Sequence, residues 1–154
     1  MKVFVTVGTT SFDELIQSID EVSNKFNRYE FIFQIAEGQY IPRSGSYFKF
    51  VDEIDMLYLS SDVVITHAGA GSIYRLLELN KKVIVVPNLV RVDKHQSDIA
   101  NYMSENGHVL LLSNLEHSFE VLSSIDSFTP VPYVKEAFFV KDEIISFIRE
   151  SVLK

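Results

Sequence analysis

The chain has 154 residues, which is room for one domain over residues 1–154 with a core that needs no disulfide or metal to hold it. It has no cysteine, which excludes thiolate catalysis and Cys-ligated zinc, and its net charge of −7 disfavours nucleic-acid partners. The N-terminal apolar stretch is too short for a signal peptide, and no apolar run approaches the roughly 20 residues of a membrane span. We therefore expect a cytoplasmic protein.

Strand and helix patterns alternate from the N-terminus. Short apolar or β-branched runs predict strands over 3–7, 29–36, 47–51, 62–66, 82–86 and 108–112. Helical spacing of apolar residues predicts helices after Ser11, which could cap the first of them, over 54–59, after Ser72, and over 94–105 and 115–125. Asn106 and Gly107 indicate a helix C-terminus. A last amphipathic helix is marked by Val140, Ile144, Ile148 and Val152, and it could be core or could dock outward.

Strands that are apolar throughout and alternate with helices are typical of a parallel sheet covered on both faces. The predicted fold class is therefore α/β, with an open, doubly wound, Rossmann-like parallel sheet. Such sheets bind ligands beyond the carboxyl ends of the strands, close to the switch in strand order. This rule directs attention to the loops after Val7, Thr66 and Val86.

The first glycine loop, residues 8–11, consists of Gly8, Thr9, Thr10 and Ser11. A glycine allows close backbone approach, and hydroxyl groups beside helix N-terminal amides suit an anion. The same residues could equally be a helix cap with polar neighbours. Neither GxGxxG nor GxxxxGK[ST] is present, so the loop carries no dinucleotide fingerprint and no Walker motif.

The second glycine loop, residues 67–72, reads His67, Ala68, Gly69, Ala70, Gly71 and Ser72. Its small side chains leave the amides of residues 69–72 open at a helix N-terminus, where oriented N–H groups and the helix dipole stabilise a diphosphate. A tight strand-to-helix turn chosen for packing is the alternative. His67 could donate to a phosphate or acceptor oxygen, or serve as a structural hydrogen-bonding residue.

The third loop follows the strand over 82–86 and carries donors on an otherwise acidic chain: Asn88, Arg91, Lys94, His95 and Gln96. Cationic and amide groups there could meet phosphate and sugar hydroxyls, or could form a solvated surface loop. The sequence has no HExxH or DxD motif and its four histidines lack ligand spacing, so we expect no metal and no cofactor. The acidic run over 52–55 is expected to be the charged start of a helix.

Four segments taken in order, VTVGTTSFDELI, THAGAGSIYRLLEL, VIVVPN and DKHQ, resemble the C-terminal half of glycosyltransferase family 28. The resemblance covers roughly residues 1–106. It is strongest to half-length members: the cytosolic subunits of dolichol-linked N-acetylglucosamine transferases, and bacterial relatives from capsule and exopolysaccharide synthesis. It implies half of a GT-B enzyme that binds a UDP-sugar as donor substrate. A membrane-associated partner subunit would bind the lipid-linked acceptor and hold this chain at the cytoplasmic membrane face.

The resemblance also assigns residues. Gly8, Thr9 and Thr10 match the loop near the diphosphate, and residues 68–72 match the loop whose amides meet the phosphates. Gln96 matches a glutamine that contacts the donor sugar, with His95 beside it. The region around Gln34 and Gly38 matches the border of the nucleotide cleft.

One position departs from the family. Members commonly carry a glutamate that grips the ribose hydroxyls where this chain has Arg75, which cannot accept hydrogen bonds, and Glu78 lies one turn further on. The implied reaction is in-line attack with inversion, in which loop amides and a cation such as Lys94 or Arg91 stabilise leaving UDP. The general base could be His67 or could come from the partner.

Two other functions fit parts of the same pattern. A nucleotide-binding module that regulates a partner without catalysis would use the same loops, and the departure at Arg75 favours it. A sugar-nucleotide epimerase also uses a GT-B arrangement, but it normally needs both halves in one chain. A flavodoxin-like fold is disfavoured because the flavin-type phosphate loop is missing.

Overall fold

The computed structural model describes residues 1–88, 95–135 and 145, and of His95 only the backbone. Its six-stranded sheet has the order β3-β2-β1-β4-β5-β6, and every neighbouring pair is parallel. The strands are β1 (Lys2–Thr6), β2 (Glu30–Gln34), β3 (Ser46–Phe48), β4 (Val63–His67), β5 (Lys82–Val86) and β6 (Leu110–Leu111). This arrangement confirms the predicted open, doubly wound α/β class.

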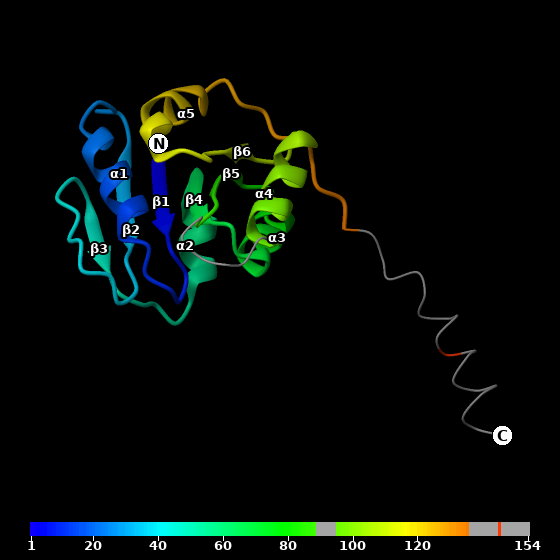
Figure 1. Ribbon diagram of the computed structural model, residues 1–154, viewed down its shortest axis with the longest axis horizontal. Coiled ribbons are helices and arrows are strands. Elements are labelled where there is room, and N and C mark those ends of the chain that lie inside the picture. The colour runs from blue at the N-terminus through cyan, green and yellow to red at the C-terminus, as the bar shows by residue number, and fades with distance from the viewer. Residues whose placement is uncertain (89–94, 136–144, 146–154) are drawn as a thin grey trace.

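Helices cover both faces of the sheet (Figure 1). Side chains of α1 (Asp13–Ser23) and α5 (Ser118–Ser124) join one core, and those of α2 (Ile54–Ser60), α3 (Ala70–Glu78) and α4 (His95–Glu105) join the other. Within β1, Val3 and Val5 belong to the first core while Phe4 belongs to the second, because successive side chains point to opposite faces. Burial on both faces explains why the central strands have no polar alternation.

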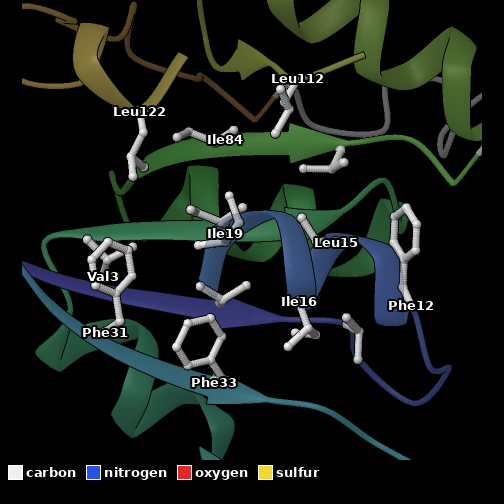
Figure 2. Packing of buried hydrophobic residues seen from close by; sticks show 14 of the residues in the cluster. Val3, Phe12, Leu15, Ile16, Ile19, Phe31, Phe33, Ile84, Leu112 and Leu122 are labelled. Atoms are coloured by element: carbon white, nitrogen blue, oxygen red, sulfur yellow. The ribbon is translucent and has the colours of Figure 1, made fainter. Parts of the chain in front are cut away.

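The first core is built on α1 (Figure 2). Leu15, Ile16 and Ile19 lie on one side of this helix and pack against Phe31 and Phe33 of β2 and neighbouring apolar residues of the sheet. Their helical spacing is the signal that predicted the helix. Fully burying a side chain of this kind contributes roughly 1.5–3 kcal/mol, so the packing of α1 holds the first glycine loop, which leads into it.

Several boundaries differ from the predictions. The prediction that Ser11 caps the first helix is wrong, because α1 begins at Asp13 with Phe12 at the cap position and no side-chain cap. Phe12 is only 6% exposed, and its burial in the core sets where the chain turns. The segment predicted as one helix over 115–125 is a 3-10 turn, Leu115–His117, followed by α5. The helix end at Gly107 is confirmed by its φ of 72°.

The strand order reverses between β1 and β4. These two strands are neighbours, with Thr6 in register with Thr66, so the loops that follow them leave the same edge of the sheet side by side. Sequence reasoning expected ligand binding at this switch point. The predicted C-terminal helix, marked by apolar residues from Val140 to Val152, lies outside the described residues apart from 145. Among the residues that are described, no helix is both long and apolar enough to cross a membrane.

Candidate functional site

The first glycine loop is held from below by buried polar side chains. Gly8 has a φ of 66°, a left-handed conformation that favours glycine. Its amide donates to Thr6 Oγ1 at 3.2 Å, and its carbonyl accepts from Gln34 Nε2 at 2.8 Å. The Thr6 hydroxyl in turn donates to Gln34 Oε1. Gln34 is 4% exposed, and both ends of its amide group form hydrogen bonds that support the loop. Its contact with the nucleotide stays a prediction.

The second glycine loop joins β4 to α3. Gly69 is the cap residue of α3, and its amide donates to the carbonyl of His67 at 2.8 Å. The prediction that the Gly69 amide is open is therefore wrong, because the turn uses it. The next amides, those of Ala70, Gly71 and Ser72, form the first turn of α3 and have no carbonyl one turn earlier to bind. They are the donors that this loop can offer to an anion.

The ring of His67 lies between the two loops. A Cβ atom added at Gly8 would lie 2.7 Å from His67 Cε1, and one added at Gly69 would lie 2.6 Å from His67 Nε2. Both distances are well inside van der Waals contact, so each glycine makes room for the imidazole. His67 is thus in contact with the backbone of both loops.

Gly71 differs from both of these glycines. Apart from the helix's own backbone, a Cβ atom added there would meet no atom of the described residues within 4 Å. Open space therefore lies beside the first turn of α3, next to the amides that lack an internal partner. Among the described residues, no side chain fills the position beside Gly71, where a ligand group could lie next to this turn.

A cavity of about 530 Å³ adjoins this turn and extends between α3 and α4. Its lining joins part of the second glycine loop to the start of α4: Ala68, Gly69, Ala70, Tyr74, Gln96, Asp98, Ile99 and Tyr102. Gln96 Oε1 is buried and has no hydrogen-bond partner among the described residues. The structure thus brings the predicted residue Gln96 to the predicted amide loop, although the two are far apart in the sequence.

Sequence reasoning missed Tyr74 and Tyr102, which line the cavity from α3 and α4. They are 39% and 61% exposed. Their exposure beside a helix start could not be read from the sequence, because an aromatic residue on an amphipathic helix is usually core.

Arg75, where the family resemblance expects a glutamate, is paired with α2. Its Nε donates to Asp55 Oδ1 and Oδ2 at 3.2 and 3.1 Å, and its Nη2 also donates to Oδ2. This hydrogen bonding lowers the pKa of Asp55. One turn away on each helix, the Tyr58 hydroxyl forms a hydrogen bond with Ser72. Burial raises the pKa of this hydroxyl, and the hydrogen bond partly offsets the rise. Two polar contacts therefore fix α2 against the start of α3.

The remaining predicted residues are placed less fully. Thr9 is exposed, and Thr10 and Asn88 are half-buried. His95 begins α4, whereas Arg91 and Lys94 lie outside the described residues. Gly38 packs on the start of α1, where a Cβ atom would clash with the Asp13 carboxylate. Within the described ranges, no group of three or more His, Asp or Glu side chains could hold a metal ion, and the expectation of a metal-free site stays a prediction.

An open doubly wound sheet with unobstructed helix amides at its switch point defines a Rossmann-like domain with a candidate anion site. Residues 2–127 match the glycosyltransferase family 28 C-terminal domain. The chain belongs to this family.

Among its relatives is the human UDP-N-acetylglucosamine transferase subunit ALG13, 36% identical over 121 residues, which are 70% of this chain and 10% of that protein. Another is the pyrophosphoryl-undecaprenol N-acetylglucosamine transferase of Finegoldia magna, 27% identical over 118 residues, 68% of this chain and 32% of that protein. The chain thus spans a tenth to a third of the length of these relatives.

Solved structures share the fold. An NMR solution structure of ALG13 has a TM-score of 0.64 at 23% identity, with 99% of this chain and 97% of that chain covered. Acinetobacter baumannii MurG has a TM-score of 0.69 at 15% identity, covering 81% and 41%. The UDP-GlcNAc 2-epimerase of Neisseria meningitidis has a TM-score of 0.60 at 14% identity, covering 82% and 36%. Transferases and an epimerase therefore share this fold, which does not distinguish their reactions.

Proposed function

We propose that this chain is the donor-binding subunit of a two-chain glycosyltransferase. It binds the diphosphate of a UDP-sugar at the second glycine loop, and a separate acceptor-binding subunit completes the enzyme. The observation that carries this proposal is the open space at Gly71, beside the first-turn amides of α3.

Gly71 is otherwise hard to explain. A glycine inside a helix is less favourable than alanine by roughly 0.5–1 kcal/mol. Outside the helix's own backbone, no atom of the described residues lies within 4 Å of its added Cβ atom, so packing against them does not require glycine there. A bound diphosphate would require it, because phosphate oxygens must approach the amides of Ala70, Gly71 and Ser72 closely.

Family membership and the relatives' names support the nature of the donor and the partner. ALG13 is named as a subunit of a UDP-N-acetylglucosamine transferase, and the bacterial relative is named as acting on a pyrophosphoryl-undecaprenol substrate. Because ALG13 is named a subunit, we infer a membrane-associated partner, which binds a lipid-linked acceptor and holds this chain at the cytoplasmic membrane face.

The chemistry of this proposal is sugar transfer with inversion. An acceptor hydroxyl attacks the anomeric carbon in line, the new carbon–oxygen bond forms, and the bond to UDP breaks. Charge develops on the leaving diphosphate, where the first-turn amides of α3 donate hydrogen bonds that strengthen in the transition state. The acceptor proton passes to a general base of the partner subunit. Gln96 at the cavity between α3 and α4 contacts the donor sugar.

A nucleotide-binding module that regulates a partner without catalysis is the second candidate. It is favoured by Arg75, which stands where the family resemblance expects a ribose-binding glutamate and forms an ion pair with Asp55. The two candidates differ in one outcome. Only the transferase subunit loses sugar transfer by the reconstituted pair when Gly71 is replaced.

Calorimetric titration with UDP, several UDP-sugars, ADP and NAD tests the proposal. We expect selective binding of UDP and a UDP-sugar by the wild-type chain, weakened at least about 100-fold, or about 2.7 kcal/mol, in Gly71→Asp by charge repulsion and blocked amides. Asn27→Asp is the matched control, because it adds the same charge at an exposed turn and should bind UDP normally. Equal affinity for ADP and UDP, or full binding by Gly71→Asp, would refute the proposal.

A further inference from the structure

The ring of His67 lies against both glycine loops. The backbone conformation of Gly69 indicates that this contact, rather than the turn itself, requires a glycine at position 69. Gly69 has φ −76° and ψ 120°, values that any residue adopts without strain. Its backbone therefore gives no reason for a glycine. Outside the adjoining residues, the three nearest described neighbours of an added Cβ atom all belong to the His67 ring, among them Nε2 at 2.6 Å and Cε1 at 3.1 Å.

Gly8 approaches the same ring from the other loop. Its added Cβ atom would lie 2.7 Å from His67 Cε1 and 3.5 Å from Nδ1. Gly8 follows β1, whereas His67 ends β4, so this contact crosses between neighbouring strands. The imidazole is therefore packed against a glycine of each loop.

We infer that His67 is a positioning residue whose imidazole ring sets the separation of the first and second glycine loops. This inference rests on the proposed function in one respect, namely that both loops face one diphosphate. With the ring in place, the loops are held at a fixed spacing before the ligand arrives. A bound group then meets a preorganised site, and little of its binding energy is lost in ordering the loops.

A double-mutant cycle tests this role. Gly69→Ala should lower the midpoint of thermal unfolding by several degrees, because the added methyl group overpacks the space beside the ring, and it should weaken UDP binding about tenfold. His67→Ala alone should also weaken UDP binding about tenfold, because the spacing is lost. Adding Gly69→Ala to His67→Ala should change neither quantity further, since the ring that opposed the new methyl group is gone.

Gly8→Ala is the internal control of the cycle. Its positive φ penalises alanine whether or not the ring is present. We therefore expect His67→Ala to restore only part of the thermal stability that Gly8→Ala removes, whereas the effect of Gly69→Ala disappears completely.

Two results would overturn the inference. One is an equal effect of Gly69→Ala in the wild-type and His67→Ala backgrounds. The other is unchanged UDP affinity in His67→Ala. A wild-type chain that binds no UDP at all would instead refute the proposed function, and the thermal-unfolding arm would still decide whether the ring sets the loop spacing.

Discussion

The two glycine loops lie side by side at the switch point but are built in opposite ways. In the first, Gly8 is fixed by its left-handed backbone and by buried hydrogen bonds from Gln34 and to Thr6. In the second, the amides at the start of α3 have no internal partner, and the space at Gly71 is open. The difference shows that a glycine can be required by the protein's own backbone and packing, as at Gly8, or can leave space for a ligand, as at Gly71. Mutation of Gly8 should therefore change stability, and mutation of Gly71 should change binding.

The largest expected effect is at Gly8. Gly8→Ala places a Cβ atom against His67 in a left-handed backbone conformation, and these two penalties should together destabilise the protein by about 2–4 kcal/mol. Chemical denaturation of the variant and the wild type would measure it. A change below about 1 kcal/mol would mean that the loop relaxes freely, and the contrast between the loops would fail.

The segment between β2 and β3 extends the comparison, because one buried carboxylate holds it. The carboxylate of Asp20, 5% exposed, accepts from the Tyr40 hydroxyl at 2.8 Å and from the amides of Arg43 and Ser44 at 3.0 and 2.8 Å. Burial alone raises the pKa of Asp20, but these bonds, with that of the Ser44 hydroxyl, bring it below its ordinary value. This residue therefore stabilises the fold above its unfolded pKa, and the contribution is lost as the pH falls through the folded value.

Asp20→Asn should accordingly cost about 2 kcal/mol at pH 7, since hydrogen bonds to a charged group contribute about 1.5–3 kcal/mol. The variant should also lose less stability than the wild type when the pH is lowered from about 5. Denaturation curves across this range provide the measurement. Parallel pH dependence of the two proteins would show that Asp20 titrates alike in the folded and unfolded states.

The support beneath the first loop predicts the next effect. Gln34→Leu leaves the Gly8 carbonyl without its donor and the Thr6 hydroxyl without its acceptor, at a cost of about 2 kcal/mol. Gln17→Leu is the control, because Gln17 is exposed on α1 and its hydrogen bond to Glu21 is a surface contact. Equal unfolding free energies for the two variants would argue against a buried support.

Sequence patterns predicted the sheet, because strands such as β4 and β5 are apolar throughout and helices such as α1 have a regular apolar stripe. They also predicted the second glycine loop, since small residues after a buried strand indicate a helix N-terminus, whereas the role of Gln96 was implied by the family resemblance. They did not predict that Gly69 makes room for His67, or that Gln34 supports Gly8. These contacts join residues through side-chain packing and strand order, which no local pattern encodes. The wrong cap at Ser11 has the same origin, because tertiary burial of Phe12 decided where α1 begins.

At Gly71 the expected change in stability is small and has the opposite sign. Gly71→Ala adds a methyl group in open space and removes backbone freedom from the unfolded chain, so the protein should be more stable by up to about 1 kcal/mol. UDP affinity should nevertheless fall, because the methyl group occupies the approach to the amides. Thermal unfolding and titration on the same sample would show both. A variant with lower stability and unchanged affinity would reverse the roles assigned to the two loops.

The smallest effect should come from Arg75, at the edge of the second loop. Its ion pair with Asp55 has both side chains 45% exposed, and such surface pairs contribute little to stability because solvent screens them. Arg75→Met should therefore destabilise the protein only slightly, and less at high salt, much as Lys49→Met should by breaking the exposed pair with Glu37. Because the guanidinium is already engaged by Asp55, UDP affinity should change by less than about threefold, or about 0.7 kcal/mol. A tenfold loss confined to Arg75→Met would show instead that this arginine leaves α2 to meet the nucleotide, and the ligand-binding surface would then extend beyond the first turn of α3.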